Sequence, residues 1–135
     1  MLFRSPTVNS TDAITDLASK GYYVLMPTAQ GIQKTDDVRD TVTIESLLTT
    51  SDSAYSKVDV NSGSIEKTDD DIEGPFDLGV SITETLDDDK ETQIVYYSSS
   101  SLMDSQINQM VSGGNEQMIM ESLSWMCSSD ETSTI

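Results

Sequence analysis

The chain is 135 residues long, with a formal net charge of −17 and no histidine. This length suffices for one domain with a hydrophobic core, so residues 1–135 are expected to form a single unit. The negative charge argues against nucleic acid and anionic lipid headgroups as partners, because both are polyanions. We expect partners that are basic, neutral or cationic. The acids gather in short runs such as Asp36-Asp37 and residues 69–71, as in solvated loops.

One cysteine, Cys127, is present, so an internal disulfide and a thiolate metal cluster are both excluded. A papain-like catalytic pair is excluded as well, because it needs a histidine. The sequence has neither a secretory signal nor an apolar run long enough to span a membrane. The loop-like sequence directly after Met1 indicates that these residues are a fragment of a longer protein.

The first half of the chain predicts a helix and two strands. Apolar residues at helical spacing indicate a short helix over residues 10–18, with Gly21 at its C-terminal end. The apolar run at residues 22–26 predicts a strand buried on both faces. A second strand begins at Thr41 and gains burial toward its end. It terminates in the hydroxyl-rich turn Thr49, Thr50 and Ser51. Residues 56–74 are polar and predict a long surface excursion.

Two further strands are predicted at residues 76–84 and 92–98. In the first, apolar and polar residues alternate, as in a strand with one wet face. In the second, Ile94, Val95, Tyr96 and Tyr97 are consecutive apolar residues, which suits a strand covered on both faces. A short polar connection without a helix joins the two strands, so we expect an antiparallel pair.

The C-terminal part predicts a serine-rich turn, a short helix, a break and a closing helix. Gly113 and Gly114 stop the short helix, and Asn115 is placed to cap the next one. The apolar residues of the closing helix recur at spacings of three and four and predict a stripe facing the core. That stripe contains Ile119, Leu123 and Met126 and is widened by Met118 and Met120. Trp125 is expected to pack against the sheet.

Two hydroxyl-rich strand ends form the candidate ligand site. In open α/β sheets ligands bind beyond the carboxyl ends of the strands, and hydroxyls ahead of a helix can hydrogen-bond an anion or a polar solute. The candidate residues, expected to converge on one edge of the sheet, are Thr49, Thr50, Ser51, Ser98, Ser99, Ser100 and Ser101. The alternative is a turn that only caps the next helix, with Ser101 accepting its first amides, since the glycines of a phosphate loop are absent.

Enzymatic activity and metal binding find little support in the sequence. Histidine is missing, and no serine lies in a Gly-x-Ser-x-Gly elbow. The segment TDDDIEG at residues 68–74 is rich enough in oxygen for calcium, but it lacks the ligand spacing of an EF-hand, which favours a solvated loop. We therefore expect a non-enzymatic domain with no cofactor and no metal.

Four segments, taken in order and spacing, resemble one known family across residues 12–127. They are YYVLMPTAQGI, TIESLLTTSDSAYSKV, GPFDLGVSIT, and IVYYSSSSLMDS followed by GGNEQMIMESLSWM. Together they are similar to the C-terminal part of the auxiliary, extracytoplasmic component of ABC-2 type transport systems, the GldG-like family. One departure is the serine turn, which stands where family members commonly carry a Gly-Asp-Ser-Asp-like turn.

The resemblance implies a mixed, mostly parallel α/β sheet flanked by helices, of the flavodoxin-like or glutamine-amidotransferase-like kind. It implies an extracytoplasmic part of a membrane-anchored protein, with more sheet before residue 1 and a transmembrane helix beyond Ile135. The partners would be the membrane subunits of an ABC transporter. The domain would act on them by protein–protein contact, or it would capture a solute for transport. Two alternatives stay open: a small-solute or glycan-binding module at the hydroxyl turns, and a hydrolase of amidotransferase ancestry with its nucleophile at Ser99 or Ser100.

Overall fold

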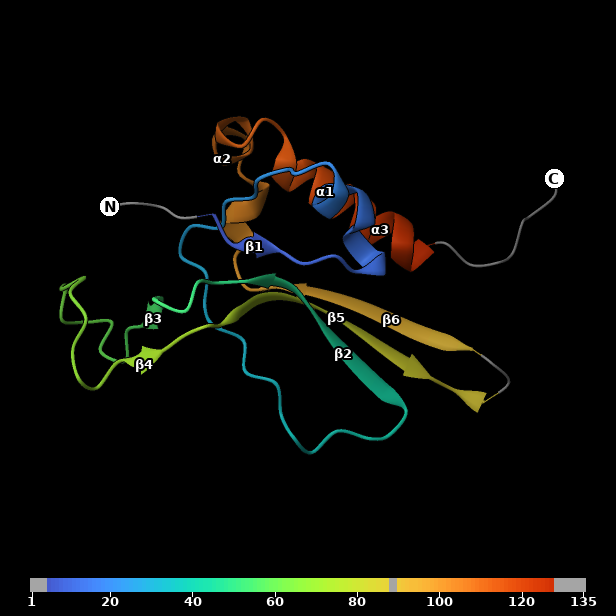
Figure 1. The fold of residues 1–135 in the computed structure, drawn as a ribbon, viewed down its shortest axis with the longest axis horizontal. Helices are drawn as coiled ribbons and strands as arrows, with labels where there is room; N and C mark the ends of the chain where they lie inside the picture. Colours follow the sequence, from blue (N-terminus) through green and yellow to red (C-terminus); the bar gives the residue numbers. More distant parts are fainter. Residues whose placement is uncertain (1–4, 88–89, 128–135) are drawn as a thin grey trace.

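The computed structural model describes residues 5–87 and 90–127. Its main sheet has the strand order β1-β2-β5-β6, with β1 at Thr7–Val8, β2 at Val42–Thr49, β5 at Asp77–Thr85 and β6 at Glu91–Tyr97. The helices lie on one face of this sheet (Figure 1). They are the 3-10 turns η1 (Asp12–Ile14) and η3 (Ser100–Met103) and the helices α1 (Thr15–Ser19), α2 (Ser105–Met110) and α3 (Gly114–Cys127). A small second sheet pairs β3 (Tyr55–Ser56) with β4 (Ile72–Glu73).

The described strands of the main sheet pair only antiparallel, so the prediction of a mostly parallel, flavodoxin-like sheet is wrong. Parallel neighbours need a crossover between them, usually a helix. Here the helices precede β2 and follow β6, and no helix of the described chain joins β2 to β5. The expected antiparallel pair is confirmed, since β5 and β6 pair from Gly79 opposite Tyr97 to Thr85 opposite Glu91.

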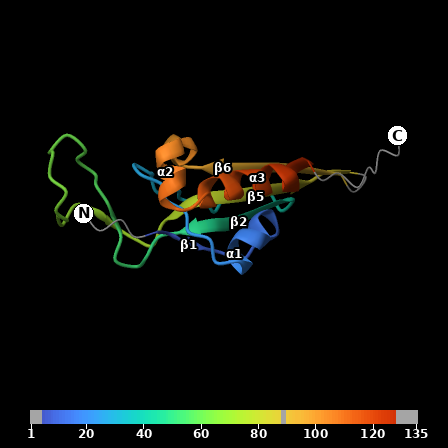
Figure 2. The same cartoon turned by 90° about the horizontal axis from the view of Figure 1, so that it is seen from above.

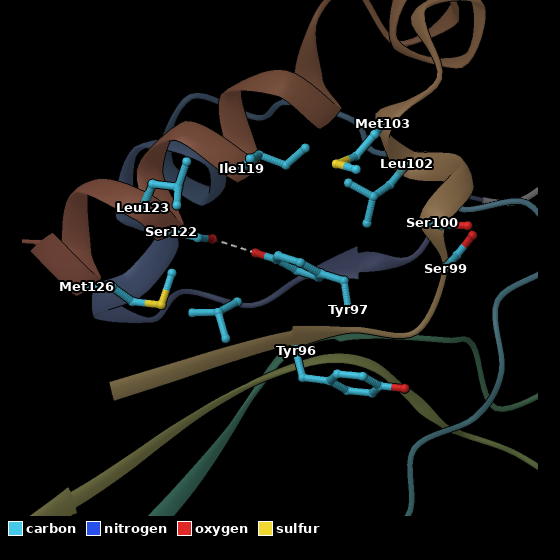
Figure 3. A pocket seen from close by; sticks show the side chains of 11 residues that line it. Tyr96, Tyr97, Ser99, Ser100, Leu102, Met103, Ile119, Ser122, Leu123 and Met126 are labelled. Atoms are coloured by element: carbon cyan, nitrogen blue, oxygen red, sulfur yellow. Dashed lines mark hydrogen bonds between the residues drawn. The ribbon is translucent and has the colours of Figure 1, made fainter. Parts of the chain in front are cut away.

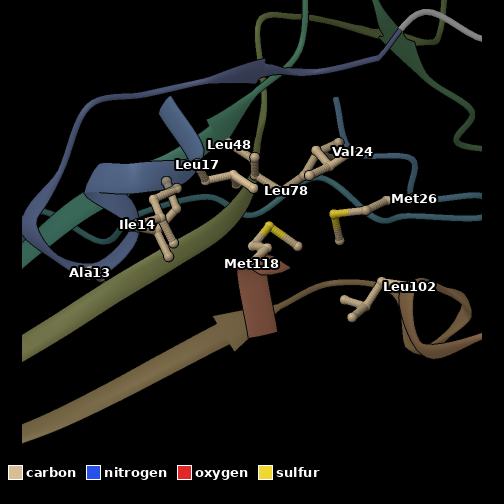
Figure 4. Packing of buried hydrophobic residues seen from close by; sticks show 10 residues of the cluster. Ala13, Ile14, Leu17, Val24, Met26, Leu48, Leu78, Leu102 and Met118 are labelled. Carbon is tan, nitrogen blue, oxygen red and sulfur yellow. The ribbon is translucent and has the colours of Figure 1, made fainter. Parts of the chain in front are cut away.

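The hydrophobic core lies between the helices and the sheet (Figure 4). The expected N-terminal helix is present as η1 followed by α1, and it buries Ile14 and Leu17. As predicted, β2 gains burial toward its end, where Leu47 and Leu48 are fully covered. Met118 of α3 meets them from the helical side. Burial of each such side chain contributes roughly 1.5–3 kcal/mol, so this compact cluster anchors α1 and α3 to the sheet.

Residues 22–26 are not the strand that their apolar run predicts. They are extended but join no sheet, and the side chain of Asn115 takes the place of a neighbouring strand. The backbone N–H of Leu25 donates to Asn115 Oδ1 at 2.9 Å, and Asn115 Nδ2 donates to the carbonyls of Leu25 at 2.8 Å and Leu102 at 3.1 Å. Asn115 therefore lies inside α3, fully buried, and is not the helix cap that its position suggested.

Gly113 and Gly114 are needed for two different reasons. Gly113 has φ +86°, in the left-handed region that favours glycine, and it follows Ser112 at φ +53° in the break after α2. Gly114 begins α3 against the carbonyl oxygen of Tyr23, and a Cβ atom there would overlap that oxygen. The second glycine thus lets the helix approach the extended segment closely enough for Asn115 to reach Leu25.

The expectation that the last strand is covered on both faces is also wrong. β6 is an edge strand whose Val95 and Tyr97 face the helices, whereas Ile94 and Tyr96 point to the opposite side and remain 50% and 53% exposed. The strand register places the apolar residues of that opposite side in adjacent rows: Val42, Ile44, Val80, Ile82, Ile94 and Tyr96. Val80, in the middle of these rows, is only 3% exposed. The continuous apolar run thus reflects two apolar faces, of which the helices cover one.

Candidate binding groove

A groove of about 390 Å³ runs between β6, η3 and α3 (Figure 3). Its floor comes from β6, its far end from η3 and its wall from α3. The lining residues are Val95, Tyr96, Tyr97, Ser99, Ser100, Leu102, Met103, Ile119, Ser122, Leu123 and Met126. No lysine, arginine or acid is among them. The groove is an apolar channel with a few hydroxyl groups, in the size range of natural ligand pockets.

The wall of the groove is the apolar stripe of α3. Ile119, Leu123 and Met126 were predicted to face the core. Ile119 does pack against the core cluster, but all three residues line the groove, and Leu123 is 46% exposed. The fully covered side of α3 is a different line of residues: Gly114, Asn115, Met118 and Ser122. Apolar periodicity placed Met118 in the predicted stripe, whereas the other three are small or polar and give no apolar signal. Trp125 is partly buried and packs against the core cluster.

Tyr97 forms the floor and is fixed by α3. Its hydroxyl lies 2.6 Å from Ser122 Oγ, and Ser122 in turn donates to the carbonyl of Met118 at 2.8 Å, so Tyr97 is the donor of the first bond. Burial raises the pKa of Tyr97 to about 12. Across the strand pair stands Gly79, where a Cβ would lie 2.6 Å from the Tyr97 ring. The Tyr97 ring therefore packs against Gly79, and its hydroxyl is hydrogen-bonded to Ser122, so both ends of the side chain are fixed.

The two hydroxyl-rich turns lie at the same end of the sheet but do not share a pocket. Both β2 and β6 run antiparallel to β5, so Thr50 N bonds Phe76 O and Ser98 N bonds Leu78 O beside the start of β5. Thr50 and Ser51 line a separate hollow near the N-terminal segment. Ser99 and Ser100 line the groove, and Ser100 and Ser101 line a further hollow beside α2.

Most of the seven candidate hydroxyls already have hydrogen-bond partners within the chain, and several of these bonds join their turn to a remote segment. Ser99 Oγ donates to the carbonyl of Pro27 at 2.6 Å and accepts from Ser101 N, so Ser99 and not Ser101 caps the following turn. Asp104 caps α2. The remaining bonds are Thr49 Oγ1 with Asn9 Nδ2, Thr50 Oγ1 with Phe76 N, Ser51 Oγ with Ser53 Oγ, and Ser101 Oγ with Thr28 Oγ1. Ser98 Oγ is covered without a partner, and Ser100 is exposed.

The acidic loop at residues 68–74 is organised around one buried carboxylate. Asp71 accepts from Lys57 Nζ at 2.7 Å and from the backbone N–H groups of Thr68 and Val58 at 2.8 and 3.2 Å. The hydrogen bond from Lys57 has the largest effect, and together these donors hold the pKa of Asp71 well below its usual range. Among the described residues no group of three or more acidic or cysteine side chains converges on a point that would suit a metal ion. Asp71 closes the base of the loop.

Comparison of the chain with protein-family models, with curated proteins and with solved structures found no match. The resemblance to the GldG-like family therefore stays a prediction. Of the groove residues, the sequence singled out Ser99 and Ser100 by position and Ile119, Leu123 and Met126 by periodicity. It did not assign Val95, Tyr97 and Ser122 to the site, because residues 94–97 are a continuous apolar run in which the sequence does not show which side chains face the helices.

Proposed function

We propose that this domain is a non-enzymatic protein-binding module that holds apolar side chains of a partner protein in the groove. The observation that carries the proposal is the exposure of flexible apolar residues along an open channel. Met103 is 72% exposed and Leu123 is 46% exposed, and both line the groove. Covering such side chains is favourable by roughly 25 cal/mol per Å² of apolar surface. Methionine adapts to partners of different shape, which suits a binding surface.

The chemistry of the groove favours apolar side chains over a polar solute. The Tyr97 and Ser122 hydroxyls are bonded to each other, and Ser99 is bonded to a backbone carbonyl, so few directional groups remain for a sugar or an anion. A hydrolase at Ser99 would need a base in contact with the hydroxyl, yet Ser99 donates to Pro27. These contacts support a binding role and speak against a glycan site and against Ser99 as a nucleophile.

A membrane subunit of an ABC transporter is the partner class that the sequence resemblance proposes. It would place the domain outside the cytoplasm of a membrane-anchored protein. The antiparallel sheet differs from the flavodoxin-like fold that the resemblance implies, so the transporter assignment rests on the four sequence segments alone. Within the described residues, no helix has the length and apolar character needed to cross a bilayer.

A peptide-display selection against the isolated chain tests the binding role. We expect selected peptides to carry apolar residues and to bind Leu123→Asp about tenfold or more weakly than wild type, because a charge at the groove wall opposes apolar contact. Leu86→Asp is the matched control, since Leu86 is 48% exposed and does not line the groove. Peptides that bind Leu123→Asp as tightly as wild type and Leu86→Asp would refute the proposal.

A further inference from the structure

The outer edge of β6 offers a regular row of backbone hydrogen-bonding groups. Ser98 N donates to Leu78 O at one end of the β5–β6 pair, and Leu86 N donates to Lys90 O at the other. In an antiparallel pair the bonded residues alternate, so the even-numbered residues of β6 point their backbone groups toward β5. The odd-numbered residues Glu91, Gln93, Val95 and Tyr97 therefore point theirs outward. No described strand pairs with that edge (Figure 2).

The outward backbone groups and the floor of the groove belong to the same residues. Val95 and Tyr97 present N–H and C=O groups to the edge and their side chains to the groove. Residues directly opposite each other in paired strands place their side chains on the same face of the sheet. A strand added opposite Val95 and Tyr97 would thus send alternate side chains into the groove, toward Met103 and Leu123. Its intervening side chains would lie beside Tyr96 on the opposite face of the sheet.

The charge distribution selects between possible strands. The chain carries −17, and five of its basic side chains are already held in ion pairs with carboxylates. Glu91 stands exposed at the start of β6 and has no ion-pair partner among the described residues. A second copy of β6 would bring the same negative charge to this edge and be repelled, whereas a strand with basic ends is attracted.

We propose that the partner of this domain is an extended segment with apolar residues at alternate positions and lysine or arginine at its ends, added antiparallel to the free edge of β6. This inference rests on the proposed function, because it specifies how a partner enters the same groove. Backbone bonds to Val95 and Tyr97 supply affinity, and the groove selects the alternate side chains. The antiparallel direction continues the pattern of the described sheet.

The test uses the synthetic peptide acetyl-KVTVTVK-amide and two copies of it, each with one N-methyl group. Methylation of the central valine removes an N–H that faces β6, and methylation of the following threonine removes one that faces solvent. We expect the first change to weaken binding about tenfold and the second to leave it within about twofold, measured by titration calorimetry. Equal effects of the two methyl groups, or the reverse order, would overturn strand addition.

Backbone amide exchange, followed by NMR, gives an independent readout. Peptide binding is expected to slow exchange at Val95 and Tyr97 and to leave Ile94 and Tyr96 unchanged, because the latter pair already bonds β5. A peptide with glutamate ends, EVTVTVE, should bind more weakly, and the difference should shrink at about 0.5 M salt, where charges are screened over a few ångström.

The outcomes separate this inference from the binding role itself. If KVTVTVK binding is lost in Leu123→Asp while both methylated peptides bind equally and Val95 exchange is unchanged, strand addition is wrong and groove binding stands. If KVTVTVK does not bind at all, the proposed partner class is wrong, and peptides found by display still decide the binding role. Concentration-dependent protection of Val95 and Tyr97 in the peptide-free protein, with a dimer mass, would assign the edge to a second copy instead.

Discussion

Replacement of Asn115 by alanine should destabilise the domain far more than an ordinary asparagine substitution. The side chain is fully buried and makes the three hydrogen bonds that tie residues 22–26 and η3 to α3. Each bond contributes about 1 kcal/mol net, and each backbone group left buried without a partner costs about 1–3 kcal/mol more. Because Leu25 is only half-buried, water can reach part of its backbone after the change. We expect a loss of about 3 kcal/mol.

This loss is large against the total free energy of unfolding of a small domain, about 5–15 kcal/mol. With an m-value of about 1–2 kcal/mol per molar, the urea midpoint should fall by about 2 M. The emission of Trp125, the one tryptophan of the chain, reports unfolding of α3, and circular dichroism reports the sheet. The matched control is Asn108→Ala, because Asn108 also makes two side-chain bonds, both to Glu116 at an exposed helix end. It should cost at most about 1 kcal/mol.

Asn115→Asp separates hydrogen bonding from packing. The aspartate keeps the shape and can still accept from Leu25 N, but its second oxygen faces the carbonyl oxygens of Leu25 and Leu102. At neutral pH it should be about as harmful as alanine, and it should recover as pH falls, because the protonated carboxyl can donate again. A loss below about 1 kcal/mol for Asn115→Ala, or an aspartate variant insensitive to pH, would refute the strand-substitute role.

Three further measurements test other contacts. In Gly114→Ala the new Cβ would overlap the carbonyl oxygen of Tyr23. We expect this clash to outweigh the roughly 1 kcal/mol by which alanine normally stabilises a helix relative to glycine, so the start of α3 should unfold or the whole domain should lose stability. A variant with a raised melting temperature would contradict this. Burial disfavours the phenolate and raises the pKa of Tyr97 to about 12 against an unfolded value near 10, so the domain is expected to lose about 3 kcal/mol of stability as pH rises from 10 to 12, because the unfolded chain ionises first. Near-ultraviolet absorbance should show one late-titrating tyrosine that disappears in Tyr97→Phe. The lowered pKa of Asp71 means that its contact with Lys57 stabilises the loop fully above pH about 4, the unfolded value, and that this stabilisation decreases as pH falls from there toward the lowered pKa. Limited proteolysis at pH 7 should cleave the loop of Asp71→Asn faster than that of wild type, and the difference should narrow as pH falls below about 4.

Local sequence patterns predicted the strands that pair with near neighbours, and they failed where the partner is remote. The alternation in β5 and the short connection to β6 were enough to predict an antiparallel hairpin. The apolar run at residues 22–26 has every local feature of a strand, yet its hydrogen-bonding partner is a side chain 90 positions away. No periodicity signals such a contact. Strand direction in the rest of the sheet was taken from the family resemblance, and no local pattern supported it.

The groove coincides only in part with the ligand site that the sequence predicts, and that site stays a prediction. The serine turn does lie at one end of the groove, because it follows the strand that forms the floor. Its hydroxyls were expected to bind a ligand, but the Ser99 hydroxyl donates its hydrogen bond to the carbonyl of Pro27. The apolar stripe containing Leu123 was assigned to the core because apolar spacing alone cannot distinguish a core face from a binding face. The buried face of α3 is polar at Asn115 and Ser122, and only their specific partners make that burial possible.

The amide that anchors residues 22–26 also bears on how the protein ages and aggregates. The segment YYVLM is uncharged, rich in aromatic and β-branched residues and free of proline, the composition of sequences that stack into intermolecular sheets. In the native fold Asn115 hydrogen-bonds both the N–H and the C=O group of Leu25, so these groups cannot pair with a strand of another chain. Chemical loss of one side-chain nitrogen, as in deamidation, would release the segment. The Asn115 amide thus limits intermolecular pairing of this segment, in addition to the repulsion that the net charge of −17 provides.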